Sequence, residues 1–242
     1  MNSLLALSAI AIITSTISGT IGMGGGILLL SAMTFFLAVD VIIPVHGIVQ
    51  LVSNSTRASI LRQHINRKLL ISFSLGVPLG AIPSTYLISS IENKHYFFLA
   101  IALIIFFSLF KPKNLKLNLP DNYFFLVGMA VGFLGLFVGA TGPFIAPFFL
   151  NERFKKEEIV ANKAAVQTIG HLIKIPAFIS LGFSYLDHDH LIIGLVIASI
   201  IGTKLGTMLL GKISERFFSK LFRCALVFAA FRLLFKYFAH TF

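Results

Sequence analysis

Long apolar stretches, separated by short polar or glycine-rich breaks, run along the whole chain. Most of them approach the length of about 20 residues that an α-helix needs to cross the hydrocarbon core of a bilayer. The pattern predicts an all-α integral membrane protein with about eight membrane helices and some broken or re-entrant segments. The predicted apolar segments are residues 4–21, 27–39, 45–61, 69–91, 96–110, 123–138, 144–150, 159–181, 191–210 and 217–238.

Two glycine-rich breaks, residues 22–26 (GMGGG) and 139–143 (GATGP), divide the chain into similar halves. Polar residues and glycines recur 117 positions apart, which an apolar chain would not do merely by being apolar. The corresponding pairs are Gly22 with Gly139, Gly25 with Gly142, Gln50 with Gln167, Asn54 with His171, and Arg57 with Lys174. We expect one membrane domain, with repeat 1 at about 1–110, a linker at 111–122 and repeat 2 at about 123–242.

The charges of equivalent loops differ between the halves. Residues 62–68 contain Arg62, Arg67 and Lys68 and no acid, which predicts a cytoplasmic loop. The equivalent residues 182–190 contain two aspartates and neither lysine nor arginine, which predicts the outer side. We therefore favour an inverted repeat, in which each glycine-rich break is a hairpin tip or separates two short spans. Eight single crossings would instead make the two halves parallel.

Composition supports a membrane protein, because 57% of the 242 residues are hydrophobic and only 12% are charged. Soluble domains carry about 25% charged residues. The first twenty residues lack lysine and arginine, so we interpret them as a membrane segment and not as a signal peptide. The single cysteine, Cys224, excludes an internal disulfide and a cysteine-based metal cluster. The net charge of +11 fits anionic lipid headgroups, and no nucleic-acid partner is predicted.

All nine acidic residues fall in loops or at the ends of segments. No carboxylate is therefore expected at membrane depth, whereas basic side chains do fall within apolar segments. Ionisable groups inside a bilayer are costly and usually face a cavity or a partner. A negatively charged substrate is the natural counterion here. The basic residues concerned are His46, Arg57, Lys163, His171, Lys174 and Lys204.

These basic residues are not equivalent candidates. Lys174 lies deepest in its segment and is the strongest. Arg57 and Lys204 could instead extend their charged ends to an interface. We interpret His46, close to Pro44, as a boundary residue, and Lys163 as an interfacial residue at the start of its helix.

Gln50, Asn54 and Arg57 form one polar stripe along a helix, and their counterparts in the second half form another. Such stripes can serve as hydrogen bonds between helices, but their matching positions favour a shared cavity. The glycine-rich breaks would present backbone N–H groups and positive helix ends to an anion; close packing of helices is the alternative. We interpret Gly76, Gly80, Gly202 and Gly206 as packing positions. The candidate substrate-binding residues are Gly24, Gly25, Gly26, Gln50, Asn54, Arg57, Thr141, Gly142, Gln167, His171 and Lys174.

Residues 19–26 (GTIGMGGG), residues 135–143 and the small-residue helix at 76–90 resemble the sulfite exporter TauE/SafE family. The resemblance spans nearly all of the chain and includes the duplication, although Thr141 and Pro143 depart from a plain glycine run. It implies a multi-pass permease of a bacterial-type inner membrane. Such permeases move small, often sulfur-containing anions such as sulfite or organosulfonates.

We therefore predict a secondary transporter for a small anion that works by alternating access, and not an enzyme. The expected partners are the anion and the lipid bilayer, with a homo-oligomer left open and no metal or cofactor. An anion channel and a membrane-embedded enzyme or assembly factor are the alternatives. The last lacks a recognisable catalytic or metal-binding set at membrane depth.

Overall fold

The computed structural model describes residues 2–22, 24–93, 95–110, 116–149, 152–210, 227, 230, 231, 234, 235, 237 and 238. Within these residues all regular structure is helical, which confirms the predicted all-α class. Three predicted features lie outside them: residues 111–115 of the linker, Cys224, and most of the last helix at 217–238.

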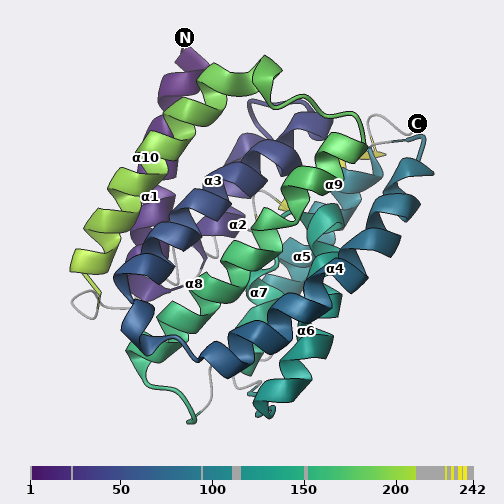
Figure 1. Cartoon of the computed structure of the whole chain (residues 1–242). Helices are drawn as coiled ribbons and strands as arrows, with labels where there is room; N and C mark the ends of the chain where they lie inside the picture. The colour runs from purple at the N-terminus through teal and green to yellow at the C-terminus, as the bar shows by residue number, and fades with distance from the viewer. Residues whose placement is uncertain are drawn as a thin grey trace.

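Ten α-helices and four short 3₁₀-helices make up the described part of the chain (Figure 1). The α-helices are α1 (Asn2–Ile21), α2 (Gly25–Met33), α3 (Val39–Ile60), α4 (Arg67–Ser89), α5 (Tyr96–Phe110), α6 (Phe124–Val138), α7 (Gly142–Ile145), α8 (Lys156–Leu172), α9 (Lys174–Ser180) and α10 (Asp189–Met208). The 3₁₀-helices are η1 (Arg62–His64), η2 (Asp121–Tyr123), η3 (Ala146–Phe148) and η4 (Leu186–His188).

Several predicted helix boundaries were wrong, among them the end of the segment predicted at 27–39, since α2 ends at Met33, and two that bear on the site. Helix α3 begins at Val39 and not at residue 45, so Asp40 and Pro44 lie inside it. Asp40 falls in the first turn, where the helix dipole favours an acid, and Pro44 interrupts only an early hydrogen bond. The segment predicted at 159–181 is divided into α8 and α9. Pro176 cannot donate to the carbonyl of Leu172, which is where α8 ends.

Four stretches of the described chain are long and apolar enough to cross a membrane: Ser3–Ile21, Arg67–Ser89, Asp121–Val138 and Leu186–Met208. Helix α5 is apolar but shorter. The structure therefore contains four candidate spans by length and composition, and the expected total of about eight stays a prediction.

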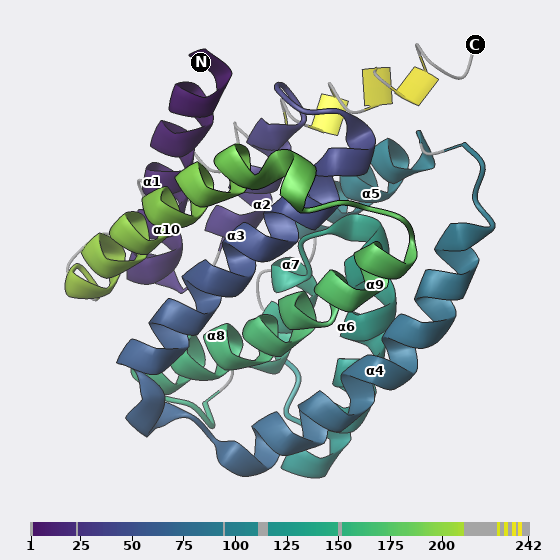
Figure 2. The ribbon, with the colours of Figure 1, turned by 45° about the horizontal axis from the view of Figure 1, so that its top comes forward.

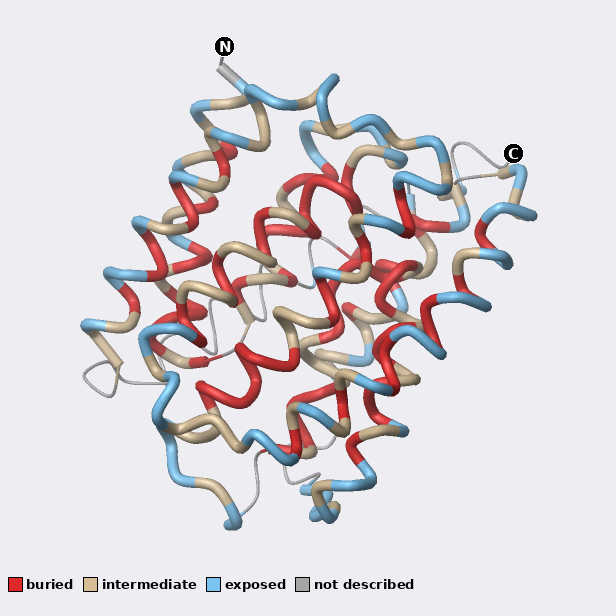
Figure 3. The backbone as a smooth tube through the Cα atoms, in the orientation of Figure 1, coloured by how far each residue is buried: buried red, intermediate tan, exposed pale blue. Residues whose placement is uncertain are grey.

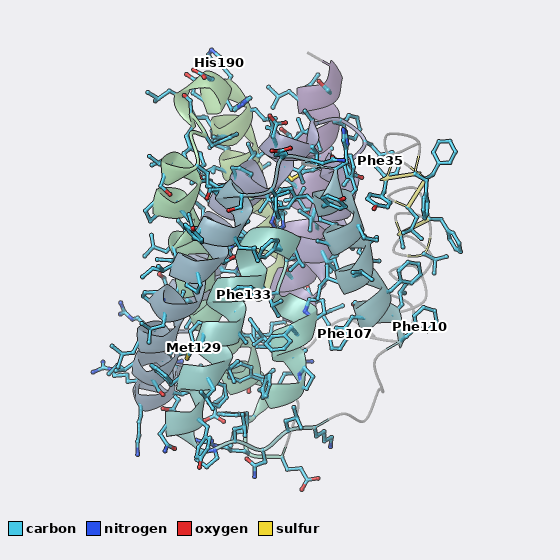
Figure 4. All side chains as sticks on the ribbon, turned by 90° about the vertical axis from the view of Figure 1, so that its right-hand side faces the viewer. Phe35, Phe107, Phe110, Met129, Phe133 and His190 are labelled. Carbon is cyan, nitrogen blue, oxygen red and sulfur yellow. The ribbon has the colours of Figure 1, made fainter. Side chains whose placement is uncertain are left out.

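The outer faces of α4 and α10 are apolar and exposed. On α4, Ile71, Leu75, Leu79 and Ile82 recur on one face and are between 51% and 67% exposed. Exposed residues follow the outer sides of both helices in Figure 3, while the buried ones concentrate toward the middle of the molecule. Figure 4 shows Phe107 and Phe110 projecting from α5. Apolar surfaces this extensive are typical of contact with lipid.

Each half contributes one helix to each of two close pairs. Helix α1 packs along α10, and α4 packs along α6, in the most extensive contacts of the fold. Figure 2 shows α3 and α8 between the two pairs, where they pack against each other. The centre of the molecule is therefore built from one helix of each half.

Glycines allow both pairs to approach closely. A Cβ atom on Gly80 would lie 1.9 Å from the Met129 carbonyl oxygen, and one on Gly202 would lie 2.3 Å from that of Ile12. Ile12 and Met129 are 117 positions apart. Gly80 and Gly202 correspond as well, because the helices that contain them align at an offset of 122 positions. The two interfaces thus use the same contact, which confirms that these glycines serve packing.

At the first glycine-rich break the chain turns back on itself. Gly22 and Gly24 have φ angles of 79° and 95°, which favour glycine. Helix α2 then folds back along α1. The two helices pack so closely that a Cβ atom on Gly25 would lie 1.8 Å from the carbonyl oxygen of Thr14. With nine residues, α2 is about 14 Å long and reaches only part of the way across a core of about 30 Å.

The second break has a related geometry. Gly139, the counterpart of Gly22, also has a positive φ angle, of 72°. A Cβ atom on Gly22 would lie 2.6 Å from Val160 of α8, and one on Gly139 would lie 3.5 Å from Ile43 of α3. Ile43 and Val160 are 117 positions apart, so each break is covered by the same position of the other half.

We expect Gly80→Ala and Gly202→Ala each to lower the free energy of unfolding by about 1–3 kcal/mol, because the added methyl group meets backbone in a packed interface. Thermal unfolding of the purified protein in detergent measures this effect.

Gly194→Ala on α10 is the matched control. Its methyl group would meet the flexible end of the Leu4 side chain at 3.0 Å, so we expect a smaller effect. Equal stability of Gly80→Ala and wild type would contradict the proposed close packing.

Candidate functional site

A small cavity lies at the centre, where α2, α3, α7 and α8 come together. Its volume of about 20 Å³ is enough for about one water molecule. The residues that line it come from both halves and from both glycine-rich breaks. They are Ser18, Gly24, Gly26, Ile27, His46, Gln50, Asn54, Ala140, Gly142, Pro143, Lys163, Gln167 and His171.

Helix α3 supplies one polar stripe to the cavity. The Nε2–H group of His46 donates a hydrogen bond of 2.8 Å to the Gly26 carbonyl oxygen at the start of α2. The Gln50 side chain lies against Gly26, whose missing Cβ atom would be 3.0 Å from Oε1. Asn54 donates from Nδ2 to the Gln50 carbonyl oxygen at 2.8 Å. These contacts fix the stripe against the first break.

Helix α8 supplies the matching stripe. Lys163, Gln167 and His171 lie 117 positions after His46, Gln50 and Asn54, and all six line the cavity. Gln167 makes a similar contact with the second break, because a Cβ atom on Gly142 would lie 3.2 Å from its Nε2 atom. Helices α3 and α8 therefore present side chains from corresponding positions to the same cavity.

The sequence-based interpretation of His46 and Lys163 was wrong. Both are fully buried at 0% exposure and line the cavity. The reason lies in the helix starts: α3 begins at Val39 and α8 at Lys156, so each residue sits two turns inside its helix. A search for corresponding polar residues one helical turn before Gln50 and Gln167 would have found His46 and Lys163.

Arg57 and Lys174 are also buried, but they hold backbone carbonyl groups beside the cavity. Arg57 donates from Nη1 to the Ser18 carbonyl oxygen at 3.0 Å and from Nη2 to Asn54 Oδ1 at 3.1 Å. Lys174 donates from Nζ to the Gly139 carbonyl oxygen. Both carbonyl groups lie at the C-terminal end of a helix that precedes a break, where a cation is favourable.

Of the predicted site residues, the cavity brings together Gly24, Gly26, Gln50, Asn54, Gly142, Gln167 and His171. It does not include Gly25, Arg57, Thr141 or Lys174 in its lining. Gly25 packs on α1 instead. Thr141 lines a separate apolar groove of about 440 Å³ between α5 and α6, to which Phe107 and Phe133 also contribute (Figure 4).

The charges around the cavity are all positive. Arg57, Lys163 and Lys174 are at most 1% exposed, whereas none of the acidic residues that the structure describes is buried. Taking a charge out of water costs several kcal/mol unless a partner offsets it. Across the described residues, no three histidine, cysteine or acidic side chains converge on a metal site. This arrangement suits a bound anion.

The comparisons with known proteins give one family. The model of the family described as sulfite exporter TauE/SafE matches residues 7–233. Comparison with curated proteins and with solved structures found no match. The match covers both glycine-rich breaks and both polar stripes, and it confirms the resemblance seen in the sequence. The chain therefore belongs to the sulfite exporter TauE/SafE family of membrane transport proteins.

Proposed function

We propose that the protein is a secondary transporter that binds a small anion in the cavity between α3 and α8. One observation carries this proposal: Arg57, Lys163 and Lys174 are buried in or beside the cavity, and no described acidic residue is buried. Three buried cations at membrane depth are costly when none of the described acidic residues is buried with them. A bound anion offsets that cost and explains why the charges are retained.

Lys163 is the cation that lines the cavity and would contact the anion directly. Gln50 on α3 and Gln167 on α8 add amide N–H donors. The first intrahelical bond of α2 runs from Leu28 N to Gly24 O, so the earlier N–H groups of this nine-residue helix have no intrahelical acceptor. An oxyanion with several acceptor oxygens matches such a set of donors.

Arg57 and Lys174 would act at a distance in this proposal. Their polar atoms hold the ends of α1 and α6 through the Ser18 and Gly139 carbonyl groups. Their charges add to the positive potential around Lys163, because little water is present to screen them. They therefore fix the shape of the site and raise its attraction for an anion.

The size of the cavity favours a carrier over an open channel. About 20 Å³ holds about one water molecule and is too small for sulfite or an organosulfonate. The substrate can enter only after α3, α8 or the two breaks separate. We infer that this structure shows a closed conformation of the transporter. The site would then open alternately to either side of the membrane.

Two inverted halves would provide such alternation. The opposite directions of α1 and α6 in Figure 1 support this arrangement, since these helices occupy corresponding positions of the two repeats. So do the reciprocal contacts of Gly22 with Val160 and of Gly139 with Ile43. We propose a single domain of about eight membrane segments, with repeats at about 1–110 and 123–242.

Family membership supports sulfite, or a related sulfur-containing anion or organosulfonate, as the substrate. It equally supports a bacterial-type inner membrane as the location.

The inverted arrangement predicts that equivalent loops lie on opposite sides of the membrane. Single cysteines at Gln63→Cys and Leu186→Cys, in a Cys224→Ser background, probe exposed positions in η1 and η4. We expect an impermeant thiol reagent added outside intact cells to label only position 186. Labelling of position 63 should require opened cells. Labelling of both positions from the same side would contradict the inverted repeat.

Lys163→Met should weaken binding of the anion about tenfold to hundredfold, because it removes one charge-assisted hydrogen bond worth about 1.5–3 kcal/mol. Binding of sulfite, sulfate, thiosulfate and isethionate to the purified protein, followed by thermal shift, measures this loss. Flux of the anion that binds, measured in proteoliposomes, should fall in parallel.

Lys204→Met is the matched control, because Lys204 is exposed on α10 and lies away from the cavity. It should bind and transport like wild type. Wild-type affinity in Lys163→Met, with the variant folded, would remove this lysine from the site.

A further inference from the structure

Two histidines from different halves meet at the cavity. The rings of His46 on α3 and His171 on α8 lie 5.7 Å apart, centroid to centroid, at an interplanar angle of 71°. Both side chains are buried, at 0% and 2% exposure, and both line the cavity. The anion site proposed above does not require either histidine ring to contact the anion.

Each ring has a nitrogen that is free to take a proton. The Nε2–H group of His46 donates to the Gly26 carbonyl oxygen, so Nδ1 is its proton-accepting nitrogen. The Nδ1 atoms of both rings are buried and have no hydrogen-bond partner. Histidine is also the side chain whose charge ordinarily changes between about pH 5 and pH 8.

The charges facing this pair are all cationic. Lys163 precedes His171 on α8, and Lys174 follows it by three residues at the start of α9. The Lys174 side chain also passes Gly47, next to His46, and Arg57 lies further along α3. Helices α1, α2 and α6 contribute no titratable side chain.

A proton on either ring would therefore add positive charge to a positive cluster. A bound anion offsets that charge, and a protonated ring in turn attracts the anion. Such coupling is reciprocal by thermodynamic necessity: whatever the anion does to proton binding, the proton does to anion binding. Two protons on rings in contact would repel each other, so the pair accommodates one.

The positions that correspond to the two histidines show that the fold does not require this pair. The counterpart of His171 is Asn54, and the counterpart of His46 is Lys163. The corresponding positions thus hold a lysine and an amide in place of the two imidazoles. An asparagine is accommodated at the equivalent helix position, so packing alone does not account for His171.

We propose that the His46–His171 pair takes up one proton as the anion binds and releases it as the anion leaves. The proton adds to Nδ1 of one ring, and no other bond is made or broken. Proton and anion then move together in the same direction, and a monovalent anion moves without net charge. This inference rests on the transport function proposed above.

Proteoliposomes with a pH-sensitive dye inside test the coupling directly. The probes are isethionate, thiosulfate and sulfate, which are anions of strong acids and keep their charge over the range of about pH 5 to pH 8 in which histidine titrates. In wild type, an inward gradient of the transported probe should acidify the lumen by about one proton per anion. Its apparent Kd should rise as the pair loses its proton, by up to about tenfold per pH unit.

His171→Asn copies the residue of the other half, and His46→Gln keeps a polar side chain on α3. In both, we expect fewer protons per transported anion and a Kd that no longer depends on pH. His190→Gln is the control, because this histidine lies exposed at one end of the molecule (Figure 4) and should keep the wild-type ratio.

Probe flux in wild type without proton movement would overturn the coupling and leave the transporter intact. An unchanged proton-to-anion ratio in both histidine variants would overturn the assignment to this pair. Absence of binding and flux for every anion tested, sulfite included, would instead overturn the proposed function. Should a variant fail to fold, the ratio measured on wild type still decides whether protons are coupled.

Discussion

Burial of positive charge without buried negative charge is the constraint on which the rest of this structure depends. Arg57, Lys163 and Lys174 have almost no exposure, and every acidic residue that the structure describes is at least partly exposed. The protein tolerates two of these charges by hydrogen-bonding them to carbonyl groups at the ends of α1 and α6. The third, Lys163, lines the central cavity, where a bound anion would bring negative charge close to all three cations.

The glycine-rich breaks make that arrangement possible. They let α2 fold back along α1, and they place the start of α2 and the start of α7 against Gln50 and Gln167. Close glycine contacts between α1 and α10, and between α4 and α6, leave α3 and α8 to meet in the middle. Residues at corresponding positions of the sequence therefore occur both in the outer pairs and in the two polar stripes that face each other.

Much of the site could be predicted because polar residues recur at a fixed separation. Gln50, Gln167, Asn54 and His171 were found in this way, and all line the cavity. His46 was missed because the predicted helix began at residue 45, after Asp40 and Pro44, whereas the first turns of α3 accommodate both residues. Lys163 was missed because its helix was predicted to begin at residue 159, whereas α8 begins at Lys156. The directions in which Thr141 and Gly25 point depend on how each break turns, which residue types alone do not specify.

The most direct test of the central claim is a crystal structure with selenite, an analogue of sulfite whose selenium can be located by anomalous scattering. The account predicts one strong anomalous peak at the cavity, within hydrogen-bonding distance of Lys163 and near Gln50 and Gln167, with α3 and α8 moved apart to make room. An empty cavity at a selenite concentration that saturates transport, or a peak only at the surface, would contradict it.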